Sequence, residues 1–398
     1  MASDWAYANA EYAVLVGIYL LLALPVSLAV GTAVARVGSG SNWSLLIVPL
    51  MAMLVIGVFA ELHNRQIREW EEASRTAFYS LKLLATPETT FGPNLDPAVT
   101  TIGALTGARA GISGVALSPD GQTAAASVRD NTVILWDIGS GKQVQVFTNH
   151  TRPVLSVAFS PDGRLLASGG ADNTVQVWDL SGKRLVRTLT GHTDHVMSVA
   201  FSPDGRVLAS AGIDRTLRLW DTGRYAERCV PLTHPSSVLQ VSFSPDGAVV
   251  ASAGLDGQIR TWDVIACSEM DSFEAGSAVH SVSFSPDGRT LATADYSTRG
   301  VITVRMWDTD TSTQRLALES ETKGSLPRIA FSPDGSLLAM AYGSRTPRVW
   351  TLPQGLLTSA TALYDNAVHS ISFSSDGRLM ATGTEMGGAV VLWGISRQ

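Results

Sequence analysis

The 398-residue sequence predicts an all-β fold built from seven similar sheets, each supplied by one sequence repeat. Three observations support this prediction: a Ser-Pro-Asp-Gly turn recurs along the chain, a tryptophan closes every unit, and short apolar runs lie between them. Residues 189–222 show one unit, in which the apolar runs 196–201, 207–211 and 217–220 alternate with turns. Short β-rich runs separated by such turns are typical of antiparallel hairpins.

The recurring turn explains why each unit folds back on itself. Proline presets its own φ, aspartate bonds the nearby backbone, and glycine adopts a positive φ without a Cβ clash. A single unit cannot bury its apolar faces, so neighbouring units must cover one another. The turns begin at Ser118, Ser160, Ser202, Ser244, Ser285 and Ser332, with the variant Ser-Ser-Asp-Gly at Ser374, and the tryptophans are Trp136, Trp178, Trp220, Trp262, Trp307, Trp350 and Trp393.

The repeat resembles the WD40 family in its period, in the low forties, and in its Gly-His and Trp-Asp pairs, such as Gly191-His192 and Trp220-Asp221. The resemblance covers residues 98–398 and implies a seven-bladed β-propeller with four strands per blade. In this family each repeat begins with the outer strand of one blade and continues with three inner strands of the next. Residues 98–106 are therefore expected to form the outer strand of the last blade and to close the ring.

The resemblance also implies a structural role for three equally spaced histidines. Equal spacing would suit a metal site, but in the family this histidine joins a buried hydrogen-bonded set with a Ser or Thr, an Asp and the Trp. The repeat therefore favours the structural interpretation. The expected sets are His150, Ser168, Asp172 and Trp178; His192, Ser210, Asp214 and Trp220; and His234, Ser252, Asp256 and Trp262.

After a short N-terminal segment (residues 1–11), the sequence predicts two membrane-spanning helices, residues 12–35 and 43–60, which contain no charged side chain. As helices they would extend about 35 Å and 27 Å, against a hydrocarbon core of about 30 Å. A cleaved signal peptide is the alternative for the first run. The length of that run and the lack of Lys or Arg before it argue against cleavage.

The segment between the spans and the repeats predicts a helix followed by a linker. Residues 61–85 place Ile67, Trp70, Ala77 and Leu81 on one face of an amphipathic helix. That face would suit a partner helix, a second copy of this chain, or a stalk against lipid headgroups. Residues 86–97 contain three prolines and predict a stiff, extended linker.

Positive charge near the span ends predicts the membrane side. Arg36 lies in the loop between the spans, whereas Arg65, Arg68 and Arg75 follow the second span. The positive-inside rule then places both termini, and with them the propeller, in the cytoplasm.

Composition and motifs exclude several classes of function. The net charge of −6 argues against a nucleic-acid partner. Cys229 and Cys267 stand at positions that do not correspond between repeats, so free buried thiols are expected rather than a disulfide framework or a metal site. The chain lacks the motifs of hydrolases, metalloproteases and nucleotide-binding proteins. We therefore expect no enzymatic activity, no cofactor and no metal.

The expected function is that of a membrane-anchored scaffold whose propeller docks a protein partner, as an accessory subunit of a membrane complex. The alternative is a membrane-bound sensor whose propeller binds a small ligand or a lipid headgroup. For each candidate contact residue, an ordinary solvated loop residue is the favoured interpretation. Three basic ones, Arg129, Arg152 and His195, could form a patch for an acidic peptide or phosphate. The candidates are the variable loop residues Arg129, Arg152, Asp194, His195, Ile213, Leu255 and Tyr296.

Overall fold

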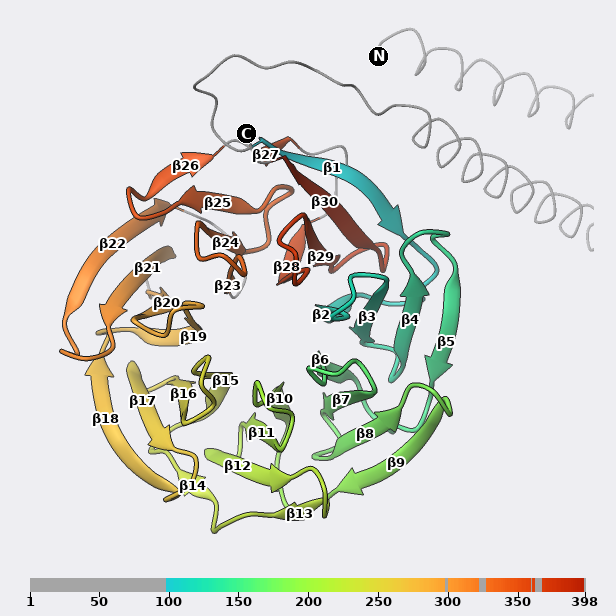
Figure 1. The fold of residues 1–398 in the computed structure, drawn as a ribbon, viewed down its shortest axis with the longest axis horizontal. Helices are drawn as coiled ribbons and strands as arrows, with labels where there is room; N and C mark the ends of the chain where they lie inside the picture. Colours follow the sequence, from blue (N-terminus) through green and yellow to red (C-terminus); the bar gives the residue numbers. More distant parts are fainter. Residues whose placement is uncertain (1–97, 298–299, 322–326, 359, 362–366, 397–398) are drawn as a thin grey trace, which may run out of the picture. The chain divides into compact units, whose positions relative to one another are not determined.

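The computed structural model describes residues 98–297, 300–321, 327–358, 360–361 and 367–396. Their strands form seven sheets arranged in a ring (Figure 1), which confirms the predicted seven-bladed propeller. The predicted segments 1–11, 12–35, 43–60, 61–85 and 86–97 lie outside the described residues. Within the described ranges, no helix combines the length and the apolar character that crossing a membrane requires.

In every blade the first strand lies nearest the centre of the ring and the last lies at the outside (Figure 1). Blade 1 contains β2 (Ile112–Leu117), β3 (Thr123–Val128), β4 (Val133–Asp137) and β5 (Gln143–Phe147). Blade 2 contains β6 (Val154–Phe159), β7 (Leu165–Gly170), β8 (Val175–Asp179) and β9 (Arg184–Leu189). Blade 3 contains β10 (Val196–Phe201), β11 (Val207–Gly212) and β12 (Thr216–Asp221), with its outer edge divided between β13 (Ala226–Glu227) and β14 (Leu232–Thr233).

The remaining blades follow the same order. Blade 4 contains β15 (Val238–Phe243), β16 (Val249–Gly254), β17 (Gln258–Asp263) and β18 (Ser268–Glu274). Blade 5 contains β19 (Ala278–Phe284), β20 (Thr290–Tyr296), β21 (Val301–Asp308) and β22 (Gln314–Glu321). Blade 6 contains β23 (Arg328–Phe331), β24 (Leu337–Ala341), β25 (Arg348–Thr351) and β26 (Leu356–Thr358). Blade 7 contains β28 (Val368–Phe373), β29 (Leu379–Thr384), β30 (Val390–Ser396) and β1 (Ala98–Leu105), beyond which β27 (Ala360–Thr361) is added.

The recurring turn joins the first and second strands of each blade by the same bonds. In blade 1 the Ser118 hydroxyl donates to Asp120 Oδ1 at 2.6 Å, and the backbone N–H of Thr123 donates to Ser118 Oγ at 2.8 Å. The bond from Ser118 lowers the pKa of Asp120, with a further contribution from the N–H of Gln122. The turn glycine has a φ between 65° and 73° in all seven blades, a region that residues with a Cβ rarely adopt.

The core is divided into seven clusters at the junctions between neighbouring blades. Trp178 of blade 2, for example, packs against Phe147 of blade 1 with ring centroids 4.3 Å apart. All seven repeat tryptophans are at most 6% exposed. Each blade therefore relies on its neighbour to bury its apolar face, as the repeat predicts.

The last blade combines the two ends of the repeat region. Strand β1 pairs antiparallel with β30, with Val99 opposite Ile395 and Leu105 opposite Val390. Strand β27, which follows the outer strand of blade 6, then pairs parallel with β1. The ring is thus closed by an antiparallel pair and an added parallel edge, and Figure 1 shows β1 and β30 side by side.

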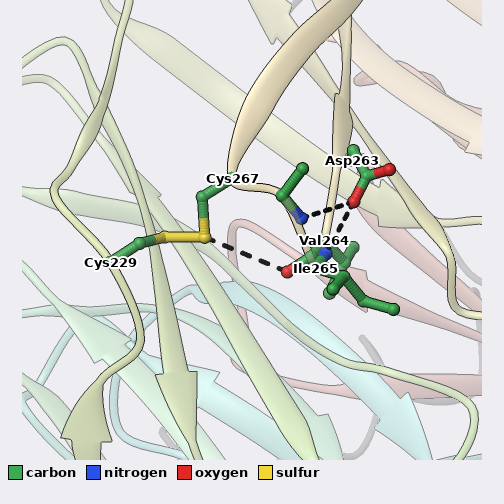
Figure 2. Close-up of a disulfide and its surroundings, with 6 residues drawn as sticks. Cys229, Asp263, Val264, Ile265 and Cys267 are labelled. Carbon is green, nitrogen blue, oxygen red and sulfur yellow. Dashed lines mark hydrogen bonds between the residues drawn. A yellow bond between two sulfur atoms is a disulfide. The ribbon is translucent and has the colours of Figure 1, made fainter.

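The expectation of free thiols is wrong, because Cys229 and Cys267 form a disulfide (Figure 2). Cys229 lies between β13 and β14 of blade 3, and Cys267 lies in the turn between β17 and β18 of blade 4. The Cα atoms are 6.4 Å apart although the residues are separated by 38 positions in the chain. Blades 3 and 4 are therefore linked covalently near their outer edges.

Removing this link is expected to destabilise the propeller. Replacing both cysteines with serine should lower the free energy of unfolding by about 2–4 kcal/mol, because the unfolded chain loses a constraint. Denaturant titration with and without a dithiol reductant measures the effect. The reductant should shift the midpoint of the native protein but not that of the C229S/C267S variant. Equal midpoints for the two proteins without reductant would contradict the prediction.

Candidate functional site

Two of the three expected histidine sets form as buried networks. In blade 2, His150 lies 2.9 Å from Asp172 Oδ2 through Nδ1 and 2.8 Å from Ser168 Oγ through Nε2. Trp178 Nε1 donates to the same hydroxyl at 2.9 Å. The simplest assignment has Nδ1–H donating to the carboxylate and the serine hydroxyl donating to Nε2. The set in blade 3, which consists of His192, Ser210, Asp214 and Trp220, repeats these contacts at 2.8 Å each.

The carboxylates of these two sets are held ionised. Burial raises the pKa of Asp214, but the hydrogen bonds from His192, from the Thr193 N–H and from Thr216 outweigh burial and bring it down to about 2. The pKa of Asp172 is lowered in the same way by His150. Each network thus satisfies its own donors and acceptors, so it stabilises a blade and leaves no coordination site free for a ligand.

The third set departs from the expected pattern. Arg260 Nη1 lies 2.9 Å from Asp256 Oδ2 and 3.2 Å from His234 Nδ1, so the guanidinium occupies the place where Asp256 would meet the imidazole. His234 Nε2 lies 3.0 Å from Ser252 Oγ, which also accepts the Trp262 N–H at 2.8 Å. Since Arg260 can only donate, His234 must accept at Nδ1 and donate from Nε2. Blade 4 therefore requires the opposite imidazole tautomer from blades 2 and 3.

This arrangement predicts a pH-dependent stability. Burial and the charge of Arg260 lower the pKa of His234 to about 4, whereas the unfolded imidazole titrates near its ordinary 6.5. The folded state disfavours protonation, so stability is complete above about pH 6.5 and falls by about 3 kcal/mol as the pH drops toward 4. Unfolding free energies of the native protein and of His234→Gln, measured at about pH 7 and about pH 4, should diverge in slope. Parallel pH profiles would show that His234 does not carry this dependence.

The other blades satisfy the tryptophan in different ways. Trp136 donates to the carbonyl oxygen of Thr106 at 3.0 Å, because Ala126 replaces the serine. Trp307 and Trp393 donate to Thr293 and Thr382, at 3.0 and 2.9 Å. In blade 6 Met340 stands at the serine position, and among the described residues Trp350 has no hydrogen-bond partner.

The candidate rim residues lie at one end of the propeller. In successive blades, the residue that follows the second strand donates its backbone N–H to the loop that enters the first strand. Arg129 donates to Gly111, Ile213 to His195 and Leu255 to Ser237, at 2.9–3.0 Å. Arg152 and Asp194 lie in the corresponding loops that enter β6 and β10. Tyr296 lies opposite Ala278 at the start of β19. The structure thus brings the seven rim residues to the same end of their blades.

The three basic rim residues do not form a continuous basic patch. Arg129 Nη1 pairs with Glu385 Oε1 at 2.9 Å, and the same carboxylate lies 2.9 Å from His369 Nε2. His195 lies 3.9 Å from Asp194. Among the described residues, Arg152 is exposed and pairs with no carboxylate. The rim therefore has mixed charge and suits a protein surface better than an extended anionic one.

The centre of the ring holds residues that the sequence analysis missed. A cavity of about 540 Å³ is lined by the first strands of blades 1 to 4, 6 and 7. On these strands the fourth residue before each turn serine, here called the ring position, is usually polar. Ser156, Ser198 and Ser281 accept the N–H groups of Val199, Val241 and Ile329 in the following blade, at 2.9–3.3 Å. The ring positions are Gly114, Ser156, Ser198, Gln240, Ser281, Arg328 and Ser370.

Arg328 is the exception among the ring positions, because a guanidinium cannot accept an N–H. Counting back from each turn serine would have revealed it as the one charged residue in this column of the repeats. A search of the described residues for three or more His, Cys, Asp or Glu side chains able to hold a metal finds no such group.

Comparison with known proteins gives one family. The family model described as the IFT122 first β-propeller matches residues 111–388, which is more than half of the chain. No curated protein matches the chain. The matched residues include the turns of all seven blades, every repeat tryptophan except Trp393, and the three histidines His150, His192 and His234. The chain therefore belongs to the family of the IFT122 first β-propeller, within the WD40 β-propellers.

Proposed function

We propose that this protein is a membrane-tethered interaction scaffold whose propeller docks a protein partner, as an accessory subunit of a membrane protein complex. The observation that carries the proposal is the gathering of seven chemically varied loop residues at one end of a closed propeller. Loops held on a rigid scaffold are where proteins commonly place their contacts. The family to which the chain belongs is consistent with a non-catalytic role.

Leu255 provides the sharpest test of the rim. Its side chain is 40% exposed at the end of β16, so Leu255→Asp should leave the fold intact and weaken partner binding. Val146 on the outer strand β5 is 39% exposed and serves as the matched control. A partner recovered stoichiometrically with the native protein and with Val146→Asp should be depleted with Leu255→Asp. Equal recovery with both variants would place the partner elsewhere.

The membrane tether rests on residues 12–35 and 43–60, which are long enough and apolar enough to span a bilayer as helices. Carbonate washing of native membranes should leave the chain in the pellet. Deleting residues 1–60 should release the remainder into the soluble fraction. Release of the full-length chain by carbonate would exclude integral insertion.

Two observations bear on the membrane side, and they oppose each other. The arginine count favours the cytoplasm by three to one. The Cys229–Cys267 disulfide favours an oxidising compartment, because cytosolic thiols are kept reduced. We give the disulfide more weight, since a difference of two arginines orients a hairpin weakly, and we place the propeller on the oxidising side.

The oxidation state of the cysteines in intact cells tests this placement. Cells quenched in acid and alkylated without reductant should yield a chain with both cysteines unmodified. Alkylation after reduction should modify both. Full modification without reductant would mean that both cysteines are reduced in cells, and it would contradict the placement of the propeller on the oxidising side.

A further inference from the structure

The central cavity contains one isolated positive charge. Arg328, at the start of β23, is the only charged residue among those that line the cavity, within the part of the chain that the structure describes. Its Nη1 donates to the backbone oxygen of His280 at 2.5 Å, and none of the described carboxylates pairs with it. Burial lowers the pKa of the Arg328 guanidinium to about 10, so it stays charged at neutral pH.

Two residues that line the same cavity, on neighbouring strands, carry buried hydroxyls that lack hydrogen-bond partners, and in their present rotamers the two oxygens are closed off from the cavity. Ser370 of β28 is 5% exposed, and its Oγ has no hydrogen-bond partner among the described residues. The buried Oγ of Ser113, on β2, is likewise unpartnered within the described chain. Strands β23, β28 and β2 follow one another around the centre of the ring (Figure 1). Unsatisfied buried hydroxyls are costly, so their presence on residues that share a cavity lining with Arg328 needs an explanation.

We propose that the central cavity is a binding site for an oxyanion, a phosphate or carboxylate group, held by the Arg328 guanidinium and by the hydroxyls of Ser113 and Ser370, which turn toward the anion by a change of side-chain rotamer. A guanidinium offers several N–H donors that match such a group, and serine hydroxyls add further donors. The cavity is much larger than one oxyanion, so the ligand is a small molecule that carries the group. This site requires neither a membrane tether nor a protein partner, and it supplies the ligand contact that a sensor would use.

The test uses the full-length chain in mild detergent, with inorganic phosphate and acetate as separate probes of the two anion classes. Ionic strength is held constant with chloride, so that general screening does not change. Saturable thermal stabilisation by phosphate identifies a phosphate site, and saturable stabilisation by acetate identifies a carboxylate site. If neither ion stabilises the native protein, the proposal is overturned.

Substitutions locate the site. Arg328→Gln should weaken binding by about 10- to 100-fold, the effect of losing a hydrogen bond to a charged group. Ser370→Ala should weaken it by about 3- to 10-fold while leaving stability unchanged or higher, because its hydroxyl has no protein partner. Arg206→Gln removes an arginine whose side chain is 86% exposed and should bind as the native protein does.

The serine variant keeps the proposal testable if Arg328→Gln does not fold. Native-like affinity in Ser370→Ala, and in Ser113→Ala, would show that these hydroxyls do not contact the anion. Native-like affinity in a folded Arg328→Gln would show that the anion does not bind in the central cavity, and it would overturn the proposal.

Discussion

Replacing Leu105 with aspartate is expected to open the ring at its closure and to prevent stable folding. Leu105 is fully buried in β1, where it lies opposite Val390 and packs with Ile112 and Trp136 of blade 1. Truncating a buried leucine costs about 2–5 kcal/mol, and burying an unpaired carboxylate costs several more. The sum is comparable to the whole stability of many proteins, about 5–15 kcal/mol.

Denaturant titration followed by tryptophan fluorescence measures the effect, because the repeat tryptophans lie in the junctions that closure protects. Thr100→Asp is the matched control, since Thr100 lies on the same strand and is exposed. The control should unfold close to the native midpoint. If Leu105→Asp unfolds at that midpoint as well, β1 does not contribute to the stability of the ring.

Trp220→Ala is expected to destabilise the protein by about 3–5 kcal/mol through the cavity that it leaves. The loss of its N–H also removes one of the bonds to Ser210, whose hydroxyl links the indole to His192. Because Ser210 keeps its bond to His192, the lost hydrogen bond adds about 0.5–1.5 kcal/mol. The full effect should therefore exceed that of a cavity alone.

Trp350 separates the two contributions. Both tryptophans are 4% exposed, but only Trp220 donates to a serine within the described chain. Trp350→Ala should thus cost only the cavity, and the difference between the two variants in unfolding free energy should be about 0.5–1.5 kcal/mol. Equal losses would mean that the Trp220–Ser210 hydrogen bond contributes no net stability.

The regular parts of the fold could be predicted because each depends on residues close together in one repeat. The turn at Ser118 to Gly121 bonds to itself, and the glycine supplies the positive φ that the turn needs. The networks of His150 and His192 also follow from repeated positions, since blades 2 and 3 carry the members at the same offsets.

The exceptions arise where a residue from outside the pattern intervenes. Arg260 belongs to the third strand of blade 4, and its long side chain reaches between Asp256 and His234, which spacing alone does not reveal. The cysteines stand at unrelated repeat positions, so their pairing depends on the proximity of two neighbouring blades. The repeat alignment shows that Arg328 is the charged ring position, but only the structure shows that the other residues lining the cavity are uncharged.

By itself the sequence determined the number of blades, the closing role of residues 98–106 and the buried histidine sets, because local turns and a fixed repeat leave a closed ring as the way to bury every apolar face. Only the tertiary structure decided the Cys229–Cys267 disulfide, the replacement of Asp256 by Arg260 as the partner of His234, and the position of Arg328 as the one charged residue that lines the central cavity among the described residues. These features depend on which side chains meet across blades, and such contacts between distant residues are set by packing rather than by any spacing along the chain.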